Sequence, residues 1–190
     1  RVHLFHGYIL DRSYLRTAKE TYERSYEENW YGTYARGCLQ EKGDSLFATD
    51  ELGMSPLYYA DFSEYLLIGN APHLMAMYLQ QLSLPVHPEE QLPMWYVTSI
   101  TVESDCTGYQ EIKRLRPYMR MQVNAENQLT ISQTRVTEIP KDHNEAVLLS
   151  LESLDRGIHA LHSQFSLSAQ LTGGYDSRLV LAILLRNHLA

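Results

Sequence analysis

The sequence predicts an α+β protein: an antiparallel β-sandwich with flanking helices, followed by the first strand and helix of a parallel α/β domain. Three observations lead to this prediction. Short β-rich segments alternate with turns over most of the chain, without the repeating βαβ order of a parallel sheet. A long amphipathic helix pattern then begins near Pro140. After it come a strand-like segment, a glycine turn and an apolar helix, the order that opens a parallel sheet.

The β-rich part contains several segments whose residues favour strands, and most of them are bounded by turn residues. We expect strands at 2–10, 31–40, 45–49, 57–60, 65–69, 120–123 and 129–132. Gly43 and Asp44 suit a tight hairpin after the second of these segments. The Asn-Ala-Glu-Asn run at 124–127 closes another hairpin.

Helices are expected between some of these strands. The stretch 12–29 is a weakly amphipathic helix candidate, because tyrosines and Leu15 recur among many charges. A second helix is predicted over 71–82, with Asn70 as its cap and Pro72 in its first turn. A short helix candidate lies within 85–92.

The character of the sequence changes near Pro140. Asp142 and Glu145 have the spacing of a capping box, and an apolar stripe follows at helical intervals: Val147, Leu151, Leu154, Ile158 and Leu161. We then expect a strand over 165–171 and a helix over 177–189. The domain boundary is therefore placed within 138–143, which gives one domain at 1–139 and the start of another at 140–190.

Composition excludes several classes of protein. The chain has 190 residues, is 44% apolar and carries a formal net charge of −7. The apolar content argues against a disordered chain, and the negative charge argues against a general nucleic-acid binder. Two cysteines without C-x-x-C spacing imply neither a disulfide framework nor a zinc site. No apolar run is long enough for a bilayer and no signal peptide is present, so we expect a cytoplasmic protein with no nucleic-acid or membrane partner.

The most informative stretch is the Leu-Thr-Gly-Gly-Tyr-Asp-Ser sequence at 171–177. Adjacent glycines allow a tight turn with exposed N–H groups, and the helix that follows adds its free N–H groups and positive dipole end. This combination suits a pyrophosphate, to which the hydroxyls of Thr172 and Ser177 could donate. Asp176 would serve as a magnesium ligand or as a clamp on the loop. The alternative is an ordinary strand-to-helix turn that contains two glycines and a serine cap.

This stretch resembles the pyrophosphate loop of the ATP pyrophosphatase group, which includes the asparagine synthetases. Other segments resemble asparagine synthetases in the same order along the chain. They are the Asp-Glu-Leu-Gly-Met-Ser-Pro-Leu-Tyr-Tyr sequence at 50–59, the Leu-Ile-Gly-Asn sequence at 67–70, the Val-His-Pro-Glu sequence at 86–89 and the Ile-Lys-Arg-Leu-Arg-Pro sequence at 112–117. Agreement of several motifs in order is more specific than any one motif.

The resemblance implies a two-domain ligase. Its N-terminal domain would be a class II glutamine amidotransferase of Ntn-hydrolase-like fold, and its C-terminal nucleotide-binding domain would adenylate a small, aspartate-like carboxylate, as in asparagine biosynthesis, and release AMP and pyrophosphate. ATP and magnesium are the implied cofactors. The implied cofactor-binding residues are Leu171, Thr172, Gly173, Gly174, Asp176 and Ser177, with Asp176 as the magnesium ligand.

The chain departs from the family at the glutaminase site. His6 stands where the family has the asparagine of its oxyanion hole, and Gly7 is retained, so the resemblance implies a degenerate hole. Arg1 stands in place of a terminal cysteine nucleophile. We therefore expect a piece of a longer ligase, inactive by itself, whose glutaminase site is absent or degenerate.

Two further expectations concern the surface. We expect an exposed apolar patch at the C-terminal end, which favours a homo-oligomer. Its members are Leu171, Val180, Leu181, Ile183, Leu184 and Leu185. The alternative function is a non-catalytic amidotransferase-like scaffold or oligomerisation domain.

His159 and His162 have a spacing that a metal site could use, but they lie off the apolar stripe, and we expect them to be exposed.

Overall fold

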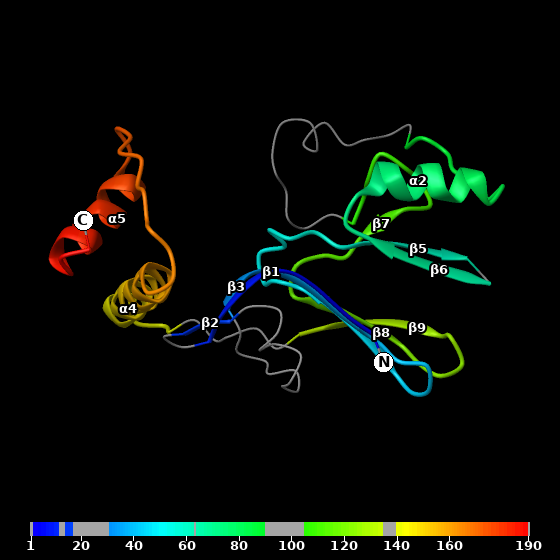
Figure 1. Ribbon diagram of the computed structural model, residues 1–190, viewed down its shortest axis with the longest axis horizontal. Coiled ribbons are helices and arrows are strands. Elements are labelled where there is room, and N and C mark those ends of the chain that lie inside the picture. The colour runs from blue at the N-terminus through cyan, green and yellow to red at the C-terminus, as the bar shows by residue number, and fades with distance from the viewer. Residues whose placement is uncertain are drawn as a thin grey trace.

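A computed structural model describes residues 2–11, 14–16, 31–62, 64–89, 105–134 and 140–189. Within these ranges the chain is a mixed α+β protein with two antiparallel sheets and three helices (Figure 1). The general class predicted from the sequence is therefore confirmed for the described part of the chain.

The larger sheet has six strands in the order β2-β1-β3-β4-β8-β9. Their bounds are β1 (Val2–Asp11), β2 (Tyr14–Arg16), β3 (Tyr31–Leu39), β4 (Ser45–Thr49), β8 (Met119–Val123) and β9 (Leu129–Gln133). All except β2 were predicted, with bounds that differ by one residue at most. Every neighbouring pair is antiparallel, including β4 with β8, which are far apart in the sequence.

The smaller sheet has three strands in the order β6-β5-β7. They are β5 (Tyr58–Phe62), β6 (Tyr65–Gly69) and the short β7 (Lys113–Arg114). Helix α2 (Pro72–Gln81) follows β6 and covers the face of this sheet that is turned away from the larger sheet (Figure 1). Met75, Ala76 and Leu79 of the helix form a buried cluster with Ala60 and Ile112.

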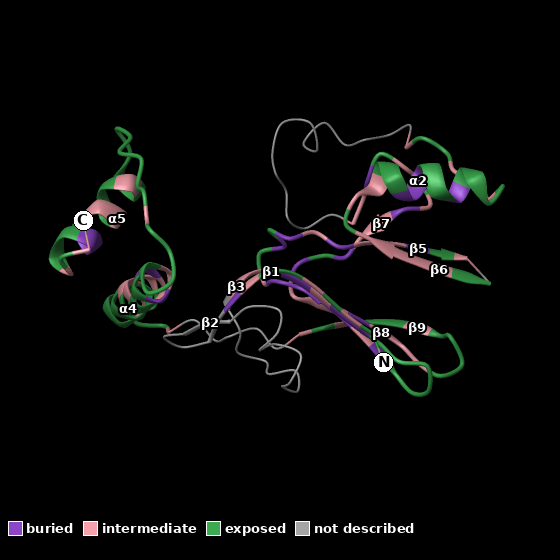
Figure 2. Ribbon diagram, in the orientation of Figure 1, coloured by how far each residue is buried: buried purple, intermediate pink, exposed green. Residues whose placement is uncertain are grey.

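A second buried cluster joins the two sheets. Ala35, Phe47 and Met121 come from the larger sheet, while Leu57 and Leu115 flank strands of the smaller one. In Figure 2 the buried residues, in purple, accordingly lie along strands of the sheets and on the inner side of α2. Burial of apolar side chains on both faces of the smaller sheet makes it the central layer of this part of the protein.

The turn after β4 is organised by one buried carboxylate. Asp50 is only 1% exposed. Its Oδ1 accepts hydrogen bonds from the N–H groups of Leu52 and Met54 at 3.1 and 3.0 Å. Its Oδ2 accepts from the N–H groups of Tyr34 and Ser55 at 3.2 and 2.8 Å. Asp50 therefore fixes the direction in which the chain leaves the larger sheet for the smaller one.

Two of the predicted helices in this part of the chain are wrong where the structure describes them. Tyr14–Arg16 is strand β2, paired with Ile9, Leu10 and Asp11, so the helix predicted at 12–29 cannot include it. The ladder with β1 satisfies the backbone there, and 17–29 lies outside the described residues. Residues 85–89 are not helical either, because Pro88 forms a bridge with Tyr109, and 90–92 lies outside the described residues.

The helix predicted over 71–82 is confirmed as α2, but its predicted cap is wrong. Ala71, not Asn70, is the N-cap, and no side chain caps the helix. Pro72 is the reason, since proline disfavours helical backbone in the residue before it. Ala71 accordingly has extended angles, φ −136° and ψ 100°.

Helices α4 (His143–His162) and α5 (Tyr175–Arg186) form the C-terminal part, drawn apart from the sheets in Figure 1. The Asp142 cap is confirmed, because its Oδ1 accepts from the N–H of Glu145 at 2.9 Å. Ile158, Ile183 and Leu184 form the buried contact between the helices. Leu171 and Leu185 are 64% and 58% exposed, as predicted, but Ile183 and Leu184 of the same predicted patch are only 6% exposed, because they pack against α4. None of the helices in the described ranges is long and apolar enough to cross a membrane.

The strand predicted over 165–171 is wrong. This segment has no regular secondary structure, and most of its side chains are exposed. A strand needs a neighbour that pairs with its N–H and C=O groups, and no described strand lies against it. The expected opening of a parallel sheet is therefore not formed here, although its helix is present. The predicted domain boundary stays a prediction, because 135–139 lies outside the described residues.

Candidate functional site

The loop at 172–177 is held in shape by a contact between its two hydroxyl side chains. The Oγ1 of Thr172 lies 2.9 Å from the Oγ of Ser177. The N–H of Thr172 donates to the same Ser177 oxygen at 3.1 Å. The sequence suggested that both hydroxyls would face a phosphate, whereas in this structure they bond to each other across the loop. Their geometry braces the turn before α5.

The braced loop presents the N-terminus of α5 to solvent. Gly174 is the N-cap and makes no side-chain cap hydrogen bond. The amide N–H groups of the first helical turn have no acceptor within the helix, and the helix dipole places partial positive charge there. Tyr175 and Asp176 in this turn are exposed. Two roles for Asp176 are compatible with this position. Its carboxylate could stabilise the N-terminus of the helix, or it could bind a cation that accompanies a phosphate.

The two glycines are not required by the backbone. Gly174 has φ −78°, and neither Gly173 nor Gly174 is among the residues with positive φ. The turn at these glycines therefore does not use the left-handed backbone that favours glycine. A Cβ built on Gly173 meets no atom within 4 Å. The space beside Gly173 is therefore open, and a ligand could approach the backbone of the loop through it.

Arg178 belongs to the site and was not predicted. Its Nε donates to the carbonyl oxygen of Gly174 at 3.1 Å, and its Nη2 donates to that of Gly173 at 3.2 Å. The guanidinium also lies 4.6 Å from the centre of the Tyr175 ring. The signal in the sequence was a cation in the first turn of a helix, where the dipole disfavours it. Arg178 therefore brings a positive charge to the loop at 172–177.

His6 and Gly7, the residues of the predicted degenerate oxyanion hole, lie on β1 in the larger sheet. They pair with Ala35 and Tyr34 of β3. Gly7 has φ +102°, and a Cβ at this position would lie 1.9 Å from the carbonyl oxygen of Thr33. Close packing of β1 on β3 therefore explains the glycine. Their role in an oxyanion hole stays a prediction.

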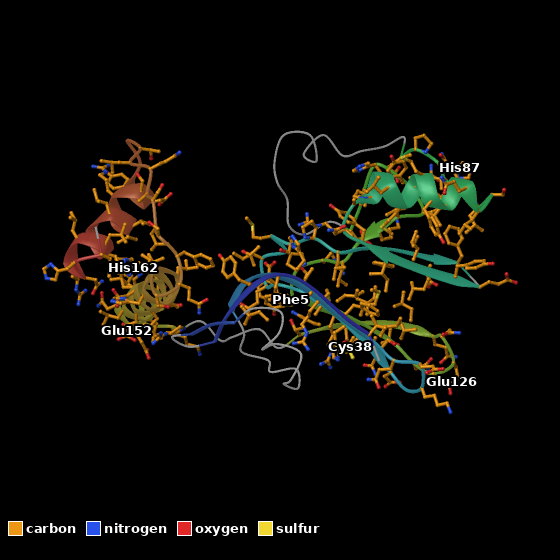
Figure 3. The ribbon with its side chains drawn as sticks, in the orientation of Figure 1. Phe5, Cys38, His87, Glu126, Glu152 and His162 are labelled. Carbon is orange, nitrogen blue, oxygen red and sulfur yellow. The ribbon has the colours of Figure 1, made fainter. Side chains whose placement is uncertain are left out.

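Metal ligands are sparse in the described part of the chain. No group of three or more His, Cys, Asp or Glu side chains gathers there to hold a metal ion. His159 and His162 are exposed on α4, as predicted (His162 is labelled in Figure 3). Mg²⁺ bound through a nucleotide needs only one or two protein carboxylates beside the phosphates. Asp176 alone is thus compatible with magnesium that arrives with ATP.

The Val-His-Pro-Glu motif at 86–89 forms a contact with the chain before β7. Nδ1 of His87 lies 2.5 Å from Oε1 of Glu111, and the N–H of His87 donates to Oε2 at 2.9 Å. Figure 3 labels His87 on the chain that leaves α2. Partial burial alone would raise the pKa of Glu111, but the hydrogen bonds from the backbone and ring of His87 hold the pKa of this carboxyl below its usual range.

A lowered carboxyl pKa predicts a pH-dependent contribution to stability. The contribution is present above the ordinary carboxyl pKa and is lost as pH falls through the lower pKa of folded Glu111. Glu111→Gln should therefore lower the urea midpoint slightly at neutral pH, and its difference from the original chain should shrink as the solution is acidified. Glu126→Gln, in the exposed turn between β8 and β9, is the control and should match the original chain. A constant difference for Glu111→Gln at every pH would contradict the assignment.

The chain was also compared with known proteins. It matches no protein-family model, and no curated protein matches it. The resemblance to asparagine synthetases therefore stays a prediction from the motifs, and a functional assignment rests on the residues and geometry of the loop.

Proposed function

We propose that residues 171–177 form the pyrophosphate-binding loop of an ATP-dependent, amide-forming ligase of the asparagine synthetase type. The ligase would adenylate a small, aspartate-like carboxylate and release AMP and pyrophosphate. ATP and Mg²⁺ are the cofactors of this proposal. The part of the loop that contacts phosphate would be its backbone, with Arg178 and Asp176 beside it.

The observation that carries the proposal is the open, braced backbone before α5. The hydroxyl oxygens of Thr172 and Ser177 lie 2.9 Å apart, and this contact holds the loop in one conformation. Binding of an anion would therefore cost little conformational entropy in the loop. Gly173 leaves the approach to the backbone free. An exposed helix N-terminus supplies N–H donors and positive potential at the same place.

Each residue near the loop has a distinct task in this proposal. The first-turn amides of α5 would hold phosphate oxygens, and Arg178 would offset the partial negative charge of the Gly173 and Gly174 carbonyl oxygens, to which it donates. Asp176 would hold the cation that accompanies the phosphates. Bound ATP supplies the leaving pyrophosphate, and fixed donors stabilise negative charge on that group as it departs.

Gly173→Ala tests this proposal without disturbing the fold. The backbone angle accepts alanine and the added methyl group meets no atom, so the free energy of unfolding should stay equal or rise by about 0.4–1 kcal/mol. Binding of magnesium pyrophosphate should weaken by at least about tenfold, or ~1.4 kcal/mol, because the methyl group lies where the anion approaches the backbone. The measurement is a titration of the loop amide chemical shifts.

Gly108→Ala is the matched control. A Cβ on Gly108 also meets nothing within 4 Å, and this glycine lies outside the loop. It should leave pyrophosphate binding unchanged. If Gly173→Ala binds pyrophosphate as well as the original chain, the loop is an ordinary turn. If pyrophosphate and MgATP cause no chemical-shift change in the loop of the original chain, the ligase hypothesis is wrong and the hypothesis of a non-catalytic scaffold replaces it.

A further inference from the structure

A polar cavity lies between the two sheets, separate from the loop at 172–177. Its volume is about 230 Å³, and residues of both sheets line it. Tyr59 on β5 and Arg114 on β7 come from the smaller sheet, and Met119 and Ile131 come from β8 and β9 of the larger one. Asp105, Arg116 and Gln133 complete the polar part of the lining.

One cation in this lining has an unused donor. Among the described residues, Nε of Arg114 is buried and has no hydrogen-bond partner. The same guanidinium is held in place on its other side, since its Nη2 donates to the carbonyl oxygen of Gly53 at 2.9 Å. An unsatisfied buried donor is unfavourable, so Arg114 is held where its charge is poorly compensated. A fixed guanidinium in the lining of a cavity is a preformed partner for an oxyanion.

Other groups set the charge and polarity of the cavity. Arg114 and Arg116 outnumber Asp105 in the lining, which leaves an excess of one positive charge. Burial raises the pKa of Tyr59, the negative charges of Asp105 and Asp61 raise it further, and Arg116 acts in the opposite direction. The Tyr59 hydroxyl thus stays protonated and available as a donor at neutral pH. A monoanion fits this balance better than a dianion.

We propose that the cavity between the sheets binds the carboxylate of a small ligand, with Arg114 and Arg116 as its cationic partners. The lining also contains Met119 and Ile131, whose apolar side chains can contact a short hydrocarbon tail. A carboxylate with a short hydrocarbon tail therefore suits the cavity better than phosphate or formate. This site is independent of the proposed ATP loop.

The test is a calorimetric and chemical-shift titration of the full chain with butyrate, acetate, inorganic phosphate and chloride. Butyrate should bind saturably and more tightly than acetate, because its tail contacts Met119 and Ile131. Phosphate and chloride should bind more weakly than either. Arg116→Gln, which removes an exposed cation and spares the Arg114 contact with Gly53, should weaken butyrate binding by about ten- to a hundred-fold.

Two controls keep the result specific. Arg156→Gln removes an exposed arginine of α4 and should leave butyrate binding unchanged, and so should Gly173→Ala in the ATP loop. Equal weakening by Arg116→Gln and Arg156→Gln would show general charge attraction and overturn the site. Tighter binding of phosphate than of butyrate would overturn the carboxylate assignment. Absence of saturable binding by any of the four anions would overturn the proposal as a whole.

Discussion

Asp50→Asn should destabilise the sheets by about 2–6 kcal/mol. The aspartate carboxylate accepts four backbone N–H groups, two on each oxygen. An asparagine has one acceptor oxygen, so in either orientation its NH₂ group faces two N–H donors that can no longer be satisfied. A donor left without a partner costs about 1–3 kcal/mol where it is buried, as at Tyr34 and Ser55, and less where it is only partly buried, as at Leu52 and Met54. The expected loss is a large share of the roughly 5–15 kcal/mol that stabilises a typical domain.

The measurement is urea denaturation followed by circular dichroism. Asp61→Asn is the control, because Asp61 lies on β5 with an exposed side chain, and its midpoint should match that of the original chain. If Asp50→Asn unfolds at the same urea concentration as the control, the carboxylate does not organise the turn between the sheets. Because the defect lies in that turn, amides of β4 and β5 should lose protection from hydrogen exchange before those of α4.

Gly7→Ala should disrupt the pairing of β1 with β3. The alanine Cβ would lie 1.9 Å from the carbonyl oxygen of Thr33, and φ at this position is +102°. Both the clash and the backbone angle oppose a side chain, and strands β1 and β3 must separate locally to admit it. We expect a loss of at least about 3 kcal/mol and faster hydrogen exchange at amides of both strands.

Gly43→Ala separates the two causes. Gly43 has the same φ of +102°, but the nearest atom to an added Cβ is 3.6 Å away. This variant should therefore show the cost of the backbone angle alone, about 1 kcal/mol. A Gly7→Ala chain no less stable than Gly43→Ala would mean that β1 does not approach Thr33 so closely. Loss of a glutaminase function in Gly7→Ala would not establish an oxyanion hole, because the packing of β1 changes too.

Local patterns predicted the sheets well, because each hairpin is specified by adjacent residues. The strand at 45–49 was predicted from its position after the turn at Gly43 and Asp44. The hairpin of β8 with β9 follows from alternating apolar and polar side chains and the turn between the strands. The strand predicted over 165–171 had β-forming residues as well, but strand formation depends on a partner that local sequence does not reveal. Similarly, Ala71 caps α2 because Pro72 acts on the residue directly before it, and this effect outweighed the capping preference of Asn70.

For the candidate sites, too, the sequence revealed features that depend on adjacent residues and not those that depend on distant segments. The loop before α5 was found from adjacent residues, whereas its bracing by Thr172 and Ser177 depends on the three-dimensional path of the turn. Contacts between distant segments, such as His87 with Glu111, left no periodic or spacing signal. The cavity with Arg114 combines residues of both sheets, so only the packing of the sheets could reveal it.

The order of strands in the larger sheet has a consequence for the protein as it is synthesised. Strand β4 pairs with β8, and the chain that forms β5, β6, α2 and β7 lies between them in the sequence. A ribosome therefore completes the entire smaller sheet and its helix before β8, the second partner of β4, exists. Until then Phe47 and Ala48, which are 3% and 0% exposed in the finished structure, belong to an edge strand that is paired with β3 on one side only. During translation, this edge is the part of the nascent chain most in need of protection from other strands.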